Sequence, residues 1–213
     1  MVTWYYYEYQ GNPMHVIFDS YPPEEIIPAS KFLNNKKLNK YFNRETAAAI
    51  VCASQLLKGL TVNPETPFYY ATGLIKYEAY GLNYIAEDSR DDNGQFSAQL
   101  FIEKGLSRIS PLTQFKVLQN MPLSFVSIEH HLTGDNAVIY SSAASLLLHA
   151  LYAPREPILI GAGKVYESGQ TDAGFALINK ADIEASPFLS FTGEATELFQ
   201  TWAQEKVLSC NEL

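Results

Sequence analysis

The sequence predicts an α/β fold in which a mixed β-sheet is layered with helices. Short apolar strands alternate with helical patterns: a strand over Thr66–Gly73 follows a helix over Glu45–Lys58, and a strand over Ala137–Tyr140 leads into an apolar helix that reaches Leu151. With 213 residues the chain is long enough for one well-buried domain and short for two. We therefore expect a single domain over residues 1–213.

The N-terminal part begins with two short runs that predict a β-hairpin. Trp4–Tyr9 is rich in aromatic residues, Met14–Phe18 is apolar, and a Gly-Asn-Pro turn separates them. The helix that follows begins at a capping residue, either Asn43 or Thr46, and is stopped by Gly59. Its alanines make this helix narrow.

Four later patterns complete the predicted fold. Phe115–His131 repeats apolar residues at helical spacing and predicts one helix, with Pro122 near its first turn. Ile158–Gly163 and Phe175–Ile178 are expected strands, and Glu194–Val207 predicts an amphipathic helix. Strands and helices therefore alternate almost to the end of the chain.

The composition indicates a folded, soluble protein whose main partner is not a nucleic acid. Hydrophobic residues make up 47% of the chain, and no apolar run approaches the length needed to span a bilayer. The net charge of −8 argues against nucleic acid, because neutralising phosphates needs a basic surface. The N-terminus lacks the basic region and apolar core of a signal peptide, which favours a cytoplasmic location.

The cysteine and histidine spacing predicts neither a metal site nor a cofactor. Cys52 and Cys210 do not form a CxxC pair, and Cys52 lies in an apolar helical pattern that favours core packing. The four histidines show no spacing typical of metal ligands. His130 and His131 stand at the end of a predicted helix, where a protonated side chain favours the helix dipole, so we expect capping and not catalysis.

One basic stretch stands out in this acidic chain. Five basic residues and no acidic one fall between Ala29 and Arg44, which leaves a charge of −13 on the rest of the chain. Such a run predicts either a docking face for an acidic partner or a solvated helix surface. The candidate docking residues are Lys36, Lys37, Lys40 and Arg44.

The segment from Gly134 to Leu151 is organised like a site for a nucleophile. An apolar strand runs into five small residues, Ser141–Ser145, and then into a helix rich in leucine. Small residues allow a ligand or a second backbone to approach closely, and the free N–H groups at a helix start stabilise negative charge. This arrangement suits acyl chemistry.

This segment resembles the nucleophile segment of β-ketoacyl synthases, members of the thiolase-like family. In that family a strand ends in Thr-Ala-Cys-Ser/Ala-Ser and the cysteine opens a buried helix. Ser141 and Ser142 match Thr-Ala, Ala143 stands in the cysteine position, and Ala144 and Ser145 match the two residues after it. By this resemblance the nucleophile is absent, and Ala143 is a degenerate nucleophile slot flanked by Ser142 and Ser145.

Other motifs extend the resemblance over most of the chain, which would correspond to the N-terminal half of a full synthase. Asp135 replaces the proline that usually follows the family's Leu-x-Gly turn. The resemblance also implies that the narrow helix over residues 45–58 packs closely under the sheet. The matching segments are Phe68–Gly73, Ile109–Pro111, Val117–Met121, Val126–Ile128, Leu132–Gly134, Ile158–Gly163 and Asp172–Ile178.

The resemblance implies a thiolase-like half, with a mixed sheet layered with helices, acting as a non-catalytic subunit. A condensing enzyme needs a thiolate and two further polar groups, which in the family are histidines of the C-terminal half, and this chain is expected to lack both. Condensing activity is therefore expected only with a partner. The chain is similar to chain-length-factor subunits, which assist acyl-chain elongation in fatty-acid, polyketide or aryl-polyene pathways.

The implied partners are a β-ketoacyl synthase subunit, or a second copy in a homodimer, and an acyl carrier protein. The strand Ala137–Tyr140 is expected near the subunit interface. Two other functions stay open. One is a free-standing module that binds an acyl group or an acyl carrier protein. The other is a serine-dependent acyl transferase or hydrolase that uses Ser142 or Ser145 with His149, although we expect His149 to pack among the leucines of its helix.

Overall fold

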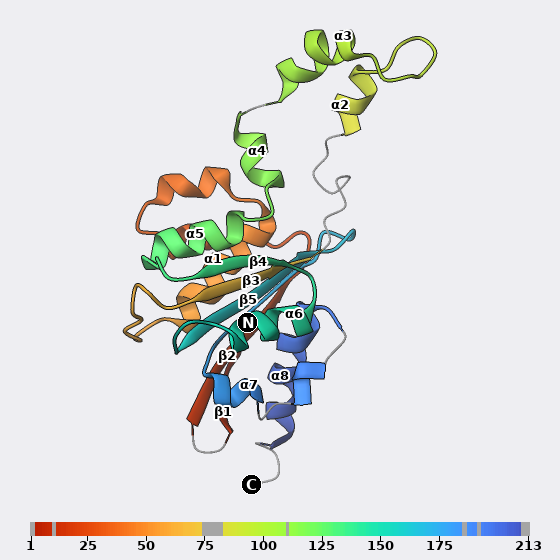
Figure 1. The fold of residues 1–213 in the computed structure, drawn as a ribbon. Helices are drawn as coiled ribbons and strands as arrows, with labels where there is room; N and C mark the ends of the chain where they lie inside the picture. Colours follow the sequence, from red (N-terminus) through yellow and green to blue (C-terminus); the bar gives the residue numbers. More distant parts are fainter. Residues whose placement is uncertain are drawn as a thin grey trace.

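A mixed β-sheet forms the centre of the fold, with helices on both of its faces (Figure 1). The structure is a computed structural model that describes residues 3–9, 12–73, 83–109, 111–184, 187–190 and 193–209. Six strands of the described part form the sheet in the order β1-β2-β6-β5-β3-β4. They are β1 (Thr3–Tyr9), β2 (Asn12–Tyr21), β3 (Phe68–Thr72), β4 (Asn136–Tyr140), β5 (Ile158–Val165) and β6 (Thr171–Ile178).

The strand directions follow from the connections between the strands. The hairpins β1–β2 and β5–β6 pair antiparallel, and β2 also pairs antiparallel with β6. The connections that lead from β3 to β4 and from β4 to β5 contain helices, and β3 pairs parallel with both β4 and β5. In this register Tyr70 lies between Val138 of β4 and Gly161 of β5. The predicted α/β class and N-terminal hairpin are therefore confirmed.

Two groups of helices cover the two faces of the sheet (Figure 1). One face packs against α1 and α5, and the other packs against α6 and α8. The helical segments are η1 (Ala29–Lys31), η2 (Lys36–Tyr41), α1 (Arg44–Leu56), α2 (Asn83–Asp88), α3 (Ala98–Leu100), η4 (Phe101–Gly105), η5 (Leu106–Arg108), α4 (Pro111–Val117), α5 (Met121–His130), α6 (Ala143–Leu151), α7 (Lys180–Glu184), η6 (Pro187–Ser190) and α8 (Ala195–Ser209).

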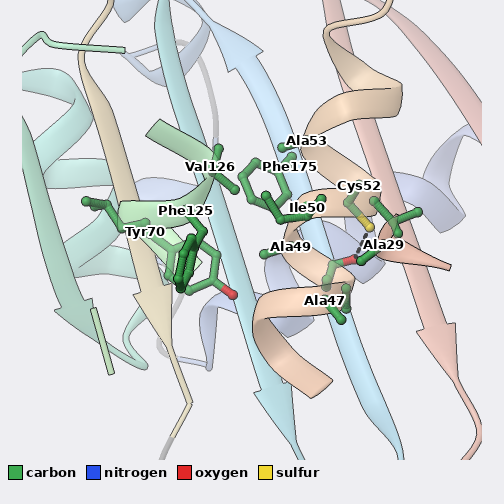
Figure 2. Close-up of a cluster of buried hydrophobic side chains, with 14 of the residues drawn as sticks. Ala29, Ala47, Ala49, Ile50, Cys52, Ala53, Tyr70, Phe125, Val126 and Phe175 are labelled. Carbon is green, nitrogen blue, oxygen red and sulfur yellow. Dashed lines mark hydrogen bonds between the residues drawn. The ribbon is translucent and has the colours of Figure 1, made fainter. Parts of the chain in front are cut away.

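The core beneath α1 explains the alanines of that helix. Asn43 caps α1, since its side chain accepts a hydrogen bond from the backbone N–H of Thr46. Figure 2 shows Ala49, Ile50 and Phe175 among the side chains buried between α1 and the sheet. Small side chains let the helix axis approach the strands closely, as predicted. Cys52 is also fully buried here, so its predicted packing role is confirmed.

Glycines in two central strands make room for large aromatic rings. A Cβ on Gly161 would lie 2.5 Å from a ring carbon of Phe175, and a Cβ on Gly174 would lie 2.4 Å from Cβ of Phe199. Phe199 belongs to α8, which begins one residue later than predicted and buries Leu198 and Phe199 against the sheet. The missing side chain at Gly174 therefore lets α8 pack closely on the sheet, and the missing side chain at Gly161 leaves room for the ring of Phe175 on the neighbouring strand.

The predicted helix Phe115–His131 is wrong in its extent, because the chain forms two helices there. α4 ends at Val117 and α5 begins at Met121. Pro122 explains the new start: proline has no backbone N–H to donate and is tolerated only in the first helical turn. The apolar spacing continues across both helices and therefore hides the break.

Candidate functional site

The junction between β4 and α6 is a tight turn formed by two serines. Ser141 adopts a left-handed backbone conformation with φ of 46°, which a non-glycine residue rarely adopts. Ser142 is the N-cap of α6, and its Oγ accepts a hydrogen bond from the backbone N–H of Ser145 at 3.2 Å. The sequence therefore predicted the strand-to-helix junction correctly, and Ala143 is the first residue of the helix.

The backbone around Ala143 is closed by the segment that leads into α8. The N–H of Ala143 donates to the carbonyl oxygen of Gly193 at 3.1 Å, and the N–H of Ala195 donates to the carbonyl oxygen of Ser141 at 2.6 Å. Lys164 of β5 forms an ion pair with Glu194, which holds this covering segment in place. Ala143 is fully buried as a result.

The closed junction offers little chemistry of its own. Ala143 brings no nucleophilic atom to the position where the helix begins. Two N–H groups at the helix start, those of Ala143 and Ser145, already donate to protein oxygens. An oxyanion hole needs N–H groups that point at the reacting oxygen, so these two do not supply one.

Ser145 and His149 do not form a nucleophile–base pair. Nδ1–H of His149 donates to the backbone carbonyl oxygen of Ser145 at 2.8 Å, and not to its Oγ. The expectation that His149 packs among the leucines is wrong, because the side chain is exposed and its ring lies 6.0 Å from that of Tyr69. His149 lies next to the exposed Leu148 and two positions after the buried Leu147, which turns its side chain roughly 200° round the helix from that leucine. The hydroxyl of Tyr69 donates to Asp135 at 2.6 Å.

A different serine–histidine contact joins α1 to α5, and no pattern in the sequence predicts it. Oγ of Ser54 and Nε2 of His130 are hydrogen-bonded at 3.1 Å. Burial, together with the nearby charge of His131, lowers the pKa of His130 to about 4. His130 is therefore neutral at pH 7, so the predicted capping by a protonated His130 is wrong. His131 ends the helix through its left-handed backbone, with φ of 55°.

A buried carboxyl group lies where α1 begins, beside β3 and β5. Glu45 is almost completely buried, and the hydroxyl of Tyr70 donates to its Oε1 at 3.2 Å. Burial raises the pKa of Glu45 to about 8, since the charged form is poorly solvated there. A Cβ on Gly163 would meet both side chains, so this glycine provides their space. Sequence reasoning missed this pair, which links residues 25 positions apart.

The candidate docking residues comprise three exposed lysines and one arginine that forms hydrogen bonds within the chain. Lys36, Lys37 and Lys40 are exposed on η2, with the Nζ of Lys40 lying 4.9 Å from the centre of the Tyr41 ring. The guanidinium of Arg44 instead donates within the chain: to Oγ1 of Thr171 at 3.1 Å, and to the carbonyl oxygens of Pro22 at 2.7 Å and Glu25 at 3.0 Å. Arg44 therefore stabilises the turn after β2, whereas the three exposed lysines are accessible to a partner.

The outer side of β4 is the second exposed surface near the junction. Among the described strands β4 lies at the edge of the sheet and pairs with β3 alone, so one row of its backbone groups has no described strand beside it. Val138 and Tyr140 on this strand are exposed, Tyr140 by 50%. The amide of Gln119 donates to the hydroxyl of Tyr140 at 3.1 Å. An exposed apolar edge of this kind suits pairing with another chain.

The described part of the chain contains neither a metal-binding cluster nor a membrane-spanning helix. Within the described ranges no three His, Cys, Asp or Glu side chains gather as metal ligands would. The helices of that same part are all too short or too polar to cross a bilayer. Comparison of the sequence with protein-family models and with curated proteins found no match.

Proposed function

We propose that the chain is a non-catalytic β-ketoacyl-synthase-like subunit that assists acyl-chain elongation in a fatty-acid, polyketide or aryl-polyene pathway. The observation that carries the proposal is the junction between β4 and α6. It has the strand, tight turn and buried helix start that the family resemblance implies, with Ala143 where that resemblance calls for cysteine. The mixed sheet with helices on both faces supports the finer proposal of a thiolase-like half.

Two features of the junction favour a non-catalytic role. A nucleophile must present a reactive atom beside hydrogen-bond donors for the developing oxyanion. Ala143 has no such atom, and its N–H group donates to Gly193. Covalent loading of an acyl group is therefore not expected here, and the subunit would contribute by shaping or completing an assembly.

The geometry weighs against the serine-dependent alternative. Oγ of Ser142 accepts the capping hydrogen bond of α6, and His149 donates to a backbone carbonyl. Among the described residues no hydrogen bond joins a serine hydroxyl of the junction to His149, so no histidine stands in place there as the general base for a serine. The other alternative is a free-standing module that binds an acyl group or a carrier protein, and the co-expression experiment below distinguishes it from the subunit.

The proposed partner surface for a synthase subunit is the open edge of β4. A strand edge with exposed Val138 and Tyr140 gains both backbone hydrogen bonds and apolar burial when another chain covers it. The proposed interface with the synthase therefore includes the strand Ala137–Tyr140, as the resemblance also implies.

The proposed surface for an acyl carrier protein is η2. Lys36, Lys37 and Lys40 are exposed cations in a chain of net charge −8. They would attract an acidic partner, whereas the acidic remainder of the chain would repel it. Changing Lys36 and Lys37 to Glu should weaken carrier binding and reduce its salt dependence, as measured by titration calorimetry at two salt concentrations. Unchanged affinity would assign these lysines to a solvated helix face.

Co-expression with a β-ketoacyl synthase from the same genome tests the proposal. Size-exclusion chromatography with light scattering should show a complex of the two chains. A Val138→Glu and Tyr140→Lys double variant should abolish the complex, while the matched variant Ile26→Lys, at another exposed apolar residue, should leave it intact. A chain that ignores the synthase but still binds the carrier would replace the subunit proposal with the binding-module function.

A further inference from the structure

A projecting arm formed by residues 83–109 carries exposed apolar side chains. Figure 1 shows this arm, with α2 and α3, extending away from the sheet. It has contacts of its own: Arg108 pairs with Asp88 at 2.9 Å, and the rings of Phe96 and Phe101 lie 5.9 Å apart. Phe96 nevertheless remains 69% exposed and Ile102 65% exposed. Such exposure is unusual for large apolar residues that lie close together in the chain.

The outer part of the arm is acidic. Residues 83–96 contain four acidic residues and one basic residue. Glu87 and Asp92 are exposed, and they precede the exposed Phe96 by nine and four positions in the sequence. Asp91 accepts hydrogen bonds from the backbone N–H groups of Asn93 and Gln95 and so stabilises the turn. The arm therefore presents negative charge together with an aromatic side chain.

The connection between β3 and β4 contains α4 as well as the arm, and α4 and η2 together form a positively charged surface. The side-chain amide of Asn43 donates to the carbonyl oxygen of Lys116 at 2.8 Å, and the rings of Tyr41 and Phe115 meet edge to face at 5.1 Å. These contacts hold α4 against η2. We call the result the basic surface. Its exposed cations are Lys36, Lys37, Lys40 and Lys116, and its exposed apolar residues are Phe115 and Leu118.

We propose that the acidic arm of one copy of the chain docks on the basic surface of a second copy. The arm's residues 83–96, with four acidic residues and one basic, are complementary in charge to the basic surface, and both surfaces expose apolar side chains that a contact would bury. The arm of the same chain extends away from its own sheet, which leaves a second copy as the occupant (Figure 1). This inference does not rest on the proposed function.

The contact is expected to be reciprocal. Because each copy carries one arm and one basic surface, a twofold arrangement satisfies both pairs at once. Exposed charges attract each other through solvent and are screened by salt, so the association should weaken as salt rises. The arm would also occupy the lysines proposed for a carrier protein, so self-association and carrier binding should compete.

A charge-swap experiment tests the docking. One variant, Lys36→Glu with Lys37→Glu, reverses the basic surface, and a second, Glu87→Lys with Asp92→Lys, reverses the arm. The full chain and both variants are compared by sedimentation velocity at low and high salt. Each variant alone should dissociate about tenfold more readily than the wild type, because attraction becomes repulsion. An equimolar mixture of the two should regain the wild-type association.

The outcomes separate this inference from the proposed function. The arm variant leaves the lysines intact, so it should bind an acidic carrier protein at least as well as the wild type does. A monomeric wild type, dimers that persist in both variants, or a mixture that stays monomeric would each overturn the docking. Circular dichroism of both variants confirms that they are folded before any comparison.

Discussion

Replacing Glu45 with glutamine should remove a part of the pH dependence of the chain's stability. The pKa of Glu45 is raised by burial from 4.5 to about 8. Between these values the folded state holds a proton that the unfolded state has released, so the free energy of unfolding falls as pH rises and levels off above about pH 8. At 1.36 kcal/mol for each pKa unit, this change amounts to about 5 kcal/mol at most.

The glutamine variant should lack this pH dependence. Its amide still accepts the hydrogen bond from Tyr70, but it buries new N–H donors, which costs about 1 to 3 kcal/mol. Wild type should therefore be more stable near pH 5, and the variant more stable by about 2 to 4 kcal/mol near pH 9. Urea unfolding followed by circular dichroism measures both curves. Parallel curves that never cross would refute the assignment of Glu45 as a buried, protonated carboxyl group.

Three further substitutions test contacts described above, each by urea unfolding. The pKa of His130 is lowered to about 4, so wild type should lose about 3 kcal/mol as pH falls from 6.5 toward 4, and His130→Gln, which keeps an amide donor for Ser54, should not. Gly174→Ala should cost about 1 to 3 kcal/mol because the new methyl group meets Phe199. Ser142→Ala should cost about 1 kcal/mol through loss of the α6 cap. A change below a few tenths of a kcal/mol in any case would contradict the corresponding contact.

The elements that the sequence predicted are those whose signals are local. Asn43 and Gly59 bracket α1, and the apolar run of β4 passes directly into the small residues that open α6. Each signal lies within one turn or one strand, where capping and side-chain alternation act. The break between α4 and α5 is local as well: Pro122 marked it, and the continuous apolar spacing concealed it.

The details of the site depended on contacts that sequence spacing does not reveal. Gly193 closes the backbone at Ala143 from 50 residues away, and Ser54 meets His130 across 76 residues. Such pairs arise only once the strand order brings α1, α5 and the start of α8 to their places. Arg44 shows the same limit, since its position in a basic run suggested docking while its guanidinium braces a distant turn.

The central claim is that the junction at Ala143 cannot hold an acyl group, and intact-protein mass spectrometry tests it most directly. The purified chain is incubated with malonyl-loaded and acyl-loaded carrier protein, and its mass is compared with that of the untreated chain. We expect an unchanged mass, because Ala143 brings no nucleophilic atom to the helix start, Ser142 and Ser145 have no histidine among the described residues hydrogen-bonded to their hydroxyls, and two N–H groups there are occupied. A covalent acyl adduct that peptide mapping assigns to Ser142 or Ser145 would contradict the claim and identify a serine-dependent acyl transferase.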